Sequence, residues 1–342
     1  MADKIDYKKI NYGIALLKMF LAFEVILEHF IDWDNYDPRL IWPFRELVSV
    51  TVTGFVILSF YFVAKLFLKR DKELIHKRMI RLLIPQIGWA FIYYITYALI
   101  DLFMHRGLHS GPMDLFWQLF TGHSRHLNPS MWFQINIIIV TIIFYFIFRL
   151  FDDKKAIITL LIITAFCYYA QFSGLNYALF GDLEFELKYP LGRIMEVFPI
   201  ATVGFLLKYF DILEKLKKYR FIIMPLCIVL FMFGFYVPWP TPKDFGFGSF
   251  AKLYLTLCVL VFAYLTPLEY LKLKYKKAIL KISSYSLGIY CAHRLVNTLL
   301  LVFLPKIPSG TFERCVLLYA LNYALSYFID LIPNKYAKAL VE

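Results

Sequence analysis

The chain has 342 residues, of which 60% are hydrophobic and 18% are charged, and its formal net charge is +12. Apolar runs long enough to cross a bilayer recur along its whole length, which excludes a soluble globular protein. Most basic residues gather in the loops on one side of these runs, so the charge excess indicates membrane orientation and excludes nucleic-acid binding. In chain order, we expect ten transmembrane helices near residues 12–31, 47–68, 81–104, 131–150, 155–172, 190–208, 220–237, 250–270, 279–304 and 312–333.

These spans predict an all-α fold, a polytopic integral membrane protein with one transmembrane domain over residues 1–342. Residues 69–80 are predicted to form an inner loop, and the longest outer loops are predicted at 32–46, 105–130 and 173–189. Because the basic loops lie on the N-terminal side and the number of helices is even, both termini are expected in the cytoplasm. The first apolar run lacks a small-residue cleavage site, so we expect it to stay as the first span.

The first apolar run carries four ionisable residues, Lys18, Glu24, Glu28 and His29. An ionisable group at bilayer depth costs roughly 2.5–3.5 kcal/mol, and such groups are rare and usually functional. Ten residues separate Lys18 from His29. On a helix their side chains therefore lie within about 20° of one another and roughly 16 Å apart along the axis. This stripe predicts proton or acyl chemistry, or transport, inside the membrane.

His29 is the candidate general base, because an imidazole with a pKa of about 6.5 accepts a proton near neutral pH. Lys18 is the candidate for positioning or neutralising a negative group. Glu28 is the acidic candidate beside His29, although its side chain points about 100° away. The alternatives are an interfacial His29 that only contacts water and a Lys18 that extends to the inner interface.

Arg78 and Arg81 stand three residues apart before the third predicted span, so on a helix they share one face. Guanidinium groups bind phosphates with paired hydrogen bonds, which makes the two arginines a candidate anion site. The alternative is a simple anchor at the inner membrane surface. Polar residues within or beside other spans are candidate substrate contacts: Ser59, Trp132, Tyr290 and His293.

Four histidines lie in the second outer loop, His105, His109, His123 and His126. Their spacings suit ligands on one helical face, and imidazole suits zinc. No cysteine or carboxylate is expected close enough to complete a convincing set, so we expect no metal. No Gly-x-Ser-x-Gly run occurs either, so the sequence does not support a hydrolase nucleophile elbow.

Taken together, these motifs resemble those of the acyltransferase 3 family of membrane-bound acyltransferases. The matching elements are a basic residue and a histidine ten residues apart, an Arg-x-x-Arg, a Trp-Phe and a late Ser-Tyr-Ser-x-Gly-Ile-Tyr-x-x-His: residues 18–29, 78–81, 132–133 and 284–293. Two departures stand out. The first-helix cation is Lys18 where the family commonly has Arg, and Ser59 is followed by Phe60 where the family usually has Gly. The missing Gly is shared with a branch that resembles polysaccharide-intercellular-adhesin membrane proteins, discussed as export proteins or O-succinyltransferases.

The resemblance implies transfer of an acyl group, acetyl or else succinyl, from acyl-CoA to a hydroxyl of an envelope carbohydrate or lipid-linked sugar. It implies a multi-pass protein of the bacterial plasma membrane, with acetyl-CoA as the expected donor. Arg78 and Arg81 would then hold CoA phosphates at the inner face, while His29 lies near the outer face. The alternative from another class is a transporter, flippase or export protein for a glycan, although no repeated halves are visible. The acceptor and the oligomeric state stay open.

Overall fold

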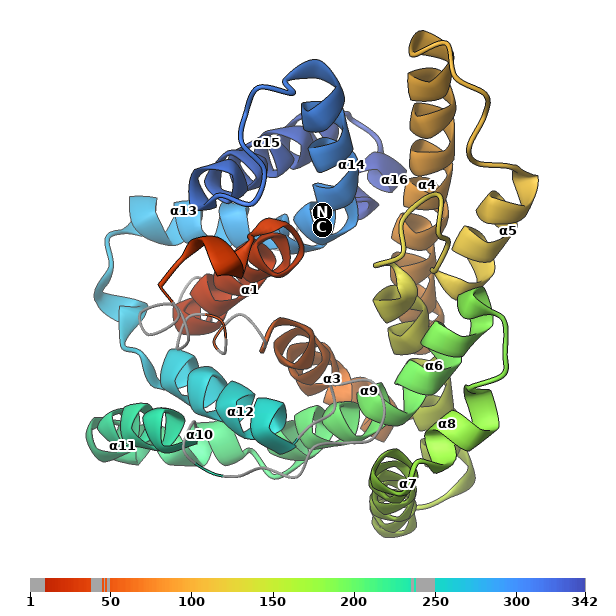
Figure 1. The fold of residues 1–342 in the computed structure, drawn as a ribbon. Helices are drawn as coiled ribbons and strands as arrows, with labels where there is room; N and C mark the ends of the chain where they lie inside the picture. Colours follow the sequence, from red (N-terminus) through yellow and green to blue (C-terminus); the bar gives the residue numbers. More distant parts are fainter. Residues whose placement is uncertain are drawn as a thin grey trace.

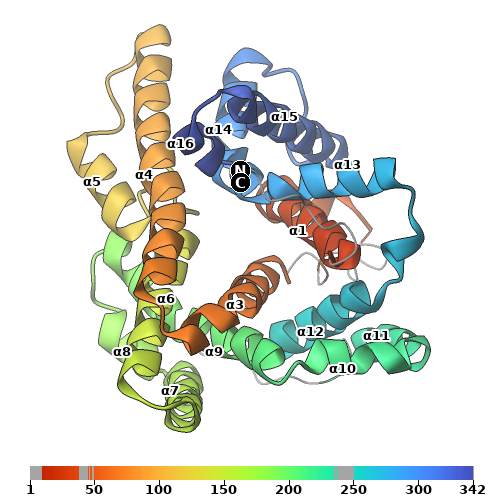
Figure 2. The same cartoon turned by 180° about the vertical axis from the view of Figure 1, so that it is seen from behind.

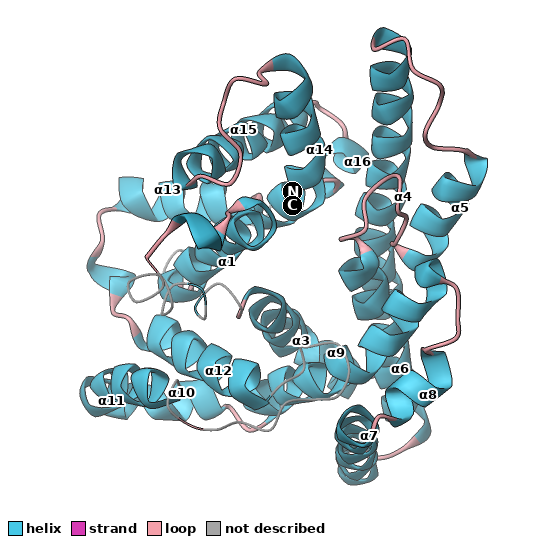
Figure 3. Ribbon diagram, in the orientation of Figure 1, coloured by secondary structure: helices cyan, strands magenta, loops and turns pink. Residues whose placement is uncertain are grey.

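The computed structural model describes residues 10–37, 50–234 and 250–341, together with the single positions 45, 47 and 237. This part of the chain is built of helices (Figures 1 and 3), with one isolated bridge between Ile31 and Gly310. Seven of its helices are long and apolar enough to cross a membrane. The prediction of an all-α polytopic membrane protein is therefore confirmed.

The long helices are α1 (Tyr12–Phe30), α3 (Thr51–Lys69), α4 (Lys72–Phe103), α6 (Trp132–Leu150), α7 (Asp153–Ser173), α9 (Phe185–Tyr209), α11 (Arg220–Gly234), α12 (Phe250–Leu265), α14 (Ser286–Phe303) and α15 (Phe312–Leu331). The short ones are α5 (Pro112–Thr121), α8 (Leu175–Phe180), α10 (Ile212–Leu216), α13 (Leu273–Ser284) and α16 (Lys335–Ala339). Three 3₁₀ turns connect them: η1 (Trp33–Asn35), η2 (Lys217–Tyr219) and η3 (Leu268–Tyr270).

The seven apolar spans in the described residues are α3, α4, α6, α7, α9, α12 with its extension to Tyr270, and α14. Three further predicted spans correspond to α1, α11 and α15. The first of these carries three charged side chains besides His29, and α11 has only 15 residues. The count of ten spans and the cytoplasmic position of both termini stay predictions, and residues 1–9 lie outside the described part of the chain.

The predicted inner loop at 69–80 is wrong, because α4 already begins at Lys72 and runs for 32 residues. The side chain of Asp71 accepts hydrogen bonds from the backbone N–H groups of Glu73 and Leu74, which caps the helix start. Arg78 and Arg81 therefore lie within a helix, on its polar first three turns, and not in a loop that precedes it.

The predicted span at 279–304 begins too early, since the chain breaks at Tyr285 into α13 and α14, and the apolar span is Ser286–Phe303. Lys281 and Tyr285 both donate to the carboxylate of Asp330 on α15, and these contacts hold the break in place. The residues before the break are rich in lysine, which is expensive at bilayer depth. The break leaves the lysine-rich residues in the short helix α13 and the apolar residues in the span α14.

α1 is the central helix of the bundle, in contact with α3, α12, α13, α14 and α15. Figures 1 and 2 show it between the C-terminal helices on one side and α12 on the other. α3 packs along α9, which also contacts α6 and α7, while α4 stands upright beside α5 and α6. The ionisable stripe of α1 is thus surrounded by other helices and does not face lipid on all sides.

The C-terminal residues join α4 to α14. The indole N–H of Trp89 donates to the carbonyl of Leu340 at 2.9 Å, and the backbone N–H of Gly288 donates to the carbonyl of Val341 at 3.2 Å. Val341 is fully buried at this junction. The start of α14, which carries several candidate site residues, is therefore fixed by a segment far away in sequence.

Gly13 allows the start of α1 to touch α12. A Cβ at Gly13 would overlap the backbone carbonyl of Ala263, which cannot move without shifting α12. We therefore expect Gly13→Ala to lower the free energy of unfolding by about 1–3 kcal/mol. Thermal unfolding of purified protein measures this effect. Gly107→Ala is the matched control, because nothing lies within 4 Å of its added Cβ, and an equal loss in both variants would contradict the close approach.

Candidate functional site

His29 lies at the C-terminal end of α1 and meets two side chains from distant parts of the chain. Its Nε2 is 3.4 Å from the Oγ of Ser130, and its Nδ1 is 3.4 Å from the Nη2 of Arg294 on α14. His29 is exposed in the structure even though these groups flank its ring. An accessible ring with partners at both nitrogens can bind a hydroxyl group and exchange a proton with it.

Ser130 is held firmly in the loop before α6. The Nε of Arg294 donates to its Oγ at 2.6 Å, and its backbone N–H donates to the Oδ1 of Asn128 at 2.9 Å. The hydroxyl of Tyr290 donates to the backbone carbonyl of Ser130. Arg294 therefore contacts Ser130 and His29 with one guanidinium group, so the three side chains form a single unit.

Two tyrosines of α4 support the part of α14 that presents Arg294. The hydroxyl of Tyr93 donates to the carbonyl of Cys291 at 2.9 Å and accepts from the backbone N–H of Leu295 at 3.0 Å. The hydroxyl of Tyr97 lies 3.1 Å from that of Thr298. These contacts fix α14 against α4 around the position of Arg294.

His293 supports His29 from behind. The two imidazole rings are stacked, with centroids 5.1 Å apart and planes 10° from parallel. His293 is fully buried, and its Nδ1 lies 2.6 Å from the carbonyl of Tyr290, so this nitrogen carries the proton. The structure thus places the predicted substrate contacts Tyr290 and His293 beside His29, Tyr290 bonded to Ser130 and His293 stacked under the imidazole.

The acidic residues of α1 have other neighbours. Glu24 is fully buried and accepts a hydrogen bond of 3.0 Å from the hydroxyl of Thr51. Glu28 is half-buried and interacts electrostatically with Lys252 and Arg193. The catalytic role of Glu28 stays a prediction, since the groups that contact the His29 ring are Ser130 and Arg294.

Trp132 begins α6 close to the same region. Its ring is buried beneath the guanidinium of Arg193, whose Cζ is 4.8 Å from the ring centroid. Arg193 also forms a buried ion pair of 3.0 Å with Glu196. The neighbouring Phe133 packs edge-on against Tyr290. Trp132 therefore acts in the structure as a support for Arg193, and its predicted contact with substrate stays a prediction.

The predicted residues at the other end of α1 also come together. Arg78 donates from Nη2 to the Oγ of Ser59 at 2.6 Å, which joins α4 to α3. Arg81 is exposed one turn further on and interacts electrostatically with both Arg78 and Lys18. Lys18, Ser59, Arg78 and Arg81 thus form one basic group, which we call the inner cluster.

A cavity of about 780 Å³ lies next to the inner cluster. Residues of α1, α3, α9, α10 and the turn after α12 line it, and Lys18 is shared between the cavity and the inner cluster. Five cationic side chains and two carboxylates line this basic cavity: Lys18, Lys65, Lys208, Lys217, Arg220, Glu214 and Glu269. This grouping could not be predicted, because Lys208, Lys217 and Arg220 follow the general pattern of basic residues on the inner side.

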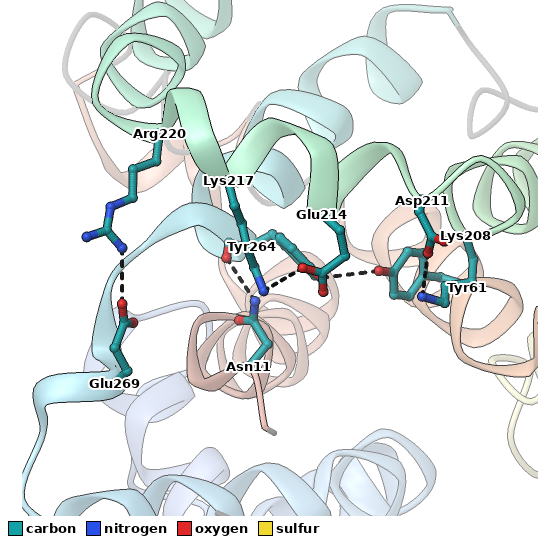
Figure 4. Close-up of polar contacts among 9 residues, drawn as sticks. All are labelled: Asn11, Tyr61, Lys208, Asp211, Glu214, Lys217, Arg220, Tyr264 and Glu269. Atoms are coloured by element: carbon teal, nitrogen blue, oxygen red, sulfur yellow. Dashed lines mark hydrogen bonds and ion pairs between the residues drawn. The ribbon is translucent and has the colours of Figure 1, made fainter. Parts of the chain in front are cut away.

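Ion pairs and aromatic rings order the wall of the basic cavity (Figure 4). Lys217 pairs with Glu214 at 2.8 Å, and Arg220 pairs with Glu269 at 3.0 Å. The hydroxyl of Tyr264 donates to Glu214 as well. Burial alone raises the pKa of Glu214, but the hydrogen bonds from Lys217 and Tyr264 outweigh it and bring the pKa below its ordinary value. Glu214 is therefore ionised at neutral pH.

The outer-loop histidines do not assemble into a metal site. His109 places its Nδ1 2.9 Å from the Oδ1 of Asp101, which ties the loop back to α4. Burial, followed by the charges of Arg193, Arg294 and Arg125, lowers the pKa of His123 to about 4. Within the described residues, no group of three or more His, Cys, Asp or Glu side chains is placed to hold a metal ion.

The described helices and charged groups define a multi-pass membrane protein whose central helix carries an accessible imidazole at one end and a basic cluster at the other. A model of the acyltransferase domain matches residues 11–331, so the chain belongs to the acyltransferase 3 family. The resemblance seen in the sequence is therefore confirmed, and the protein is a membrane acyltransferase. Comparison with curated proteins and with solved structures gave no match.

Proposed function

We propose that this membrane acyltransferase transfers an acyl group from acyl-CoA to a hydroxyl of a cell-envelope carbohydrate in the bacterial plasma membrane. Acetyl-CoA is the expected donor, and succinyl is the alternative acyl group. The observation that carries the proposal is the accessible His29 ring with Ser130 and Arg294 at its two nitrogens. A group that must deprotonate a sugar hydroxyl needs this combination of access and fixed orientation.

In the proposed reaction, His29 takes the proton of the acceptor hydroxyl while the hydroxyl oxygen attacks the thioester carbonyl. The new C–O bond forms, the C–S bond breaks, and the leaving CoA thiolate receives the proton from His29. The guanidinium of Arg294, next to both His29 and Ser130, supplies positive charge close to the oxygen that becomes negative during the attack. No separate metal is required for this sequence of steps.

In the proposed reaction, one end of α1 binds the donor and the other end carries the catalytic base. Lys18 and His29 are roughly 16 Å apart along the helix axis, so the charged end of the donor and the reacting carbonyl occupy different depths. Arg78, Arg81 and Lys18 hold the charged end at the inner cluster. The extended arm of CoA then runs along α1 towards His29, and the acceptor hydroxyl binds next to this histidine.

Acyl-CoA labelled in its acyl group tests the enzyme against the transporter alternative. We expect saturable binding to the purified protein and label transfer to an added glycan acceptor. The double variant Arg78→Gln, Arg81→Gln should weaken donor binding by at least about tenfold, because each guanidinium–phosphate contact is charge-assisted. Arg149→Gln is the matched control, since this arginine is exposed at the end of α6. A protein that binds no acyl-CoA and transfers no label would favour the transporter.

A further inference from the structure

The basic cavity carries more positive charge than its own carboxylates neutralise. Five cationic side chains face two carboxylates along its lining. Lys217 and Arg220 pair with these two carboxylates, and Lys208 pairs with Asp211 outside the lining. Within the described residues, Lys18 and Lys65 form no ion pair with any carboxylate. Several cations around one concave space attract a ligand with several negative charges.

The cations of the wall are held in position before any ligand arrives. The Nζ of Lys208 lies 5.5 Å from the ring centroid of Tyr61, and the Nζ of Lys217 lies 5.0 Å from that of Tyr264. Lys208 also pairs with Asp211 at 2.8 Å. Ordered ammonium groups bind phosphate with a smaller entropic loss than free side chains do.

The size of the cavity favours a large organic anion over a single phosphate ion. Its volume of about 780 Å³ falls within the usual range for sites that enclose a small organic ligand, roughly 300–1,000 Å³. A single phosphate ion would leave most of this space empty. The aromatic side chains of Tyr12, Tyr61 and Tyr264 in the lining add flat apolar surface beside the cations. A nucleotide with several phosphates satisfies both the charge and the volume.

The position of the cavity connects it to the reaction. Lys18 belongs to the cavity lining and to the inner cluster, and it stands on the same helix as His29. A ligand bound here has one end among the cations and can extend along α1. Neither Arg78 nor Arg81 lines the cavity, so these arginines lie beside the bound charges and not around them.

We infer that the basic cavity binds the phosphorylated nucleotide end of the acyl-CoA donor, with Lys65, Lys208 and Lys217 as phosphate contacts. This inference rests on the proposed function. It assigns the nucleotide to a site formed by α3, α9 and the α10 region, and it leaves Arg78 and Arg81 of the inner cluster to contact the donor phosphate that lies closest to the arm.

Binding of adenosine 3′,5′-bisphosphate to the purified full-length protein in phosphatidylcholine nanodiscs tests this inference. We expect Lys65→Gln and Lys217→Gln each to weaken binding by about tenfold, because each removes a charge-assisted contact. Lys215→Gln should bind like the unchanged protein, since Lys215 is an exposed neighbour of Lys217 that does not line the cavity. Lys65 and Lys217 are themselves exposed, so both variants should fold normally.

Other sources of phosphate give different results. Inorganic phosphate that binds as tightly as the bisphosphate would overturn the nucleotide assignment, and so would loss of nucleotide binding when the nanodiscs contain phosphatidylglycerol. Equal binding in all lysine variants would overturn the location. His29→Ala should keep full nucleotide binding, because His29 lies at the far end of α1. Bisphosphate binding without any acyl transfer would therefore contradict the proposed function and leave the cavity assignment intact.

Discussion

Replacing His29 with alanine is expected to lower the rate of acyl transfer by at least about 100-fold, the usual contribution of a general base. The reaction needs a group that removes the acceptor proton, and the His29 imidazole is the accessible ring between Ser130 and Arg294. Transfer of labelled acyl groups by the purified variant measures the effect. Donor binding should stay unchanged, so the loss falls on kcat.

The stability of the His29→Ala protein is measured as a control for loss of the fold. His29 is exposed, and the two contacts of its ring nitrogens are each 3.4 Å long. Even with the stacking on His293, its removal should change the free energy of unfolding by less than about 1 kcal/mol. His126→Ala removes another exposed histidine, from the loop before α6, and should leave the rate unchanged. A folded His29→Ala protein that still acylates its acceptor at the normal rate would contradict the assignment of the base.

Arg294→Lys is expected to lower kcat by about tenfold to 100-fold while the KM for the donor changes little. A compact ammonium group cannot contact Ser130 and His29 simultaneously as the planar guanidinium does. Single-turnover and steady-state kinetics of the purified variant separate the two constants. If Ser130 and Arg294 act as one unit, the double variant Ser130→Ala, Arg294→Lys should be no slower than Arg294→Lys alone.

Arg106→Lys is the matched control for Arg294→Lys, because Arg106 is exposed in the loop after α4. Fully multiplicative losses in the double variant would show that Ser130 and Arg294 act independently, contrary to the shared guanidinium contact. A rise in KM with unchanged kcat would place Arg294 in donor binding instead of beside the reacting oxygen.

The candidate site could be predicted from sequence where its signal is local. Lys18 and His29 interrupt an apolar run, and their separation on an α-helix follows from the helix repeat alone. The Arg78 and Arg81 pair is likewise visible as a short motif. The family followed from several such motifs taken together, and the matched model over residues 11–331 confirms it.

The contacts between these motifs could not be predicted, because they depend on packing between distant segments. Nothing near Ser130 in sequence indicates that Arg294, which is 164 residues away in the chain, donates to its hydroxyl. The pairing of Arg78 with Ser59 depends in the same way on how α4 packs against α3.

The predicted helix boundaries were wrong where polar residues continue a helix beyond its apolar part. α4 starts nine residues before the predicted span because the capping side chain of Asp71 and the following residues favour helix although they are polar. The break at Tyr285 was not predicted, because no proline marks it and serines such as Ser284 and Ser286 are also tolerated inside helices. Its cause is the set of contacts to Asp330 on another helix.

The proposed reaction uses the two ends of α1 for different tasks. The basic cavity and the inner cluster lie at the start of α1, and His29 lies at its end. α1 packs against α3, α12, α13, α14 and α15, so side chains from five helices contact it.

Mass analysis of the surface glycan from cells with and without the gene tests whether this protein acylates an envelope carbohydrate. We predict that cells with the gene carry an added acetyl or succinyl mass on carbohydrate hydroxyls, removable by mild base, and that cells with the His29→Ala variant lack it. Identical acylation in all three strains, with the variant present at normal levels in the membrane, would contradict acyl transfer by this protein.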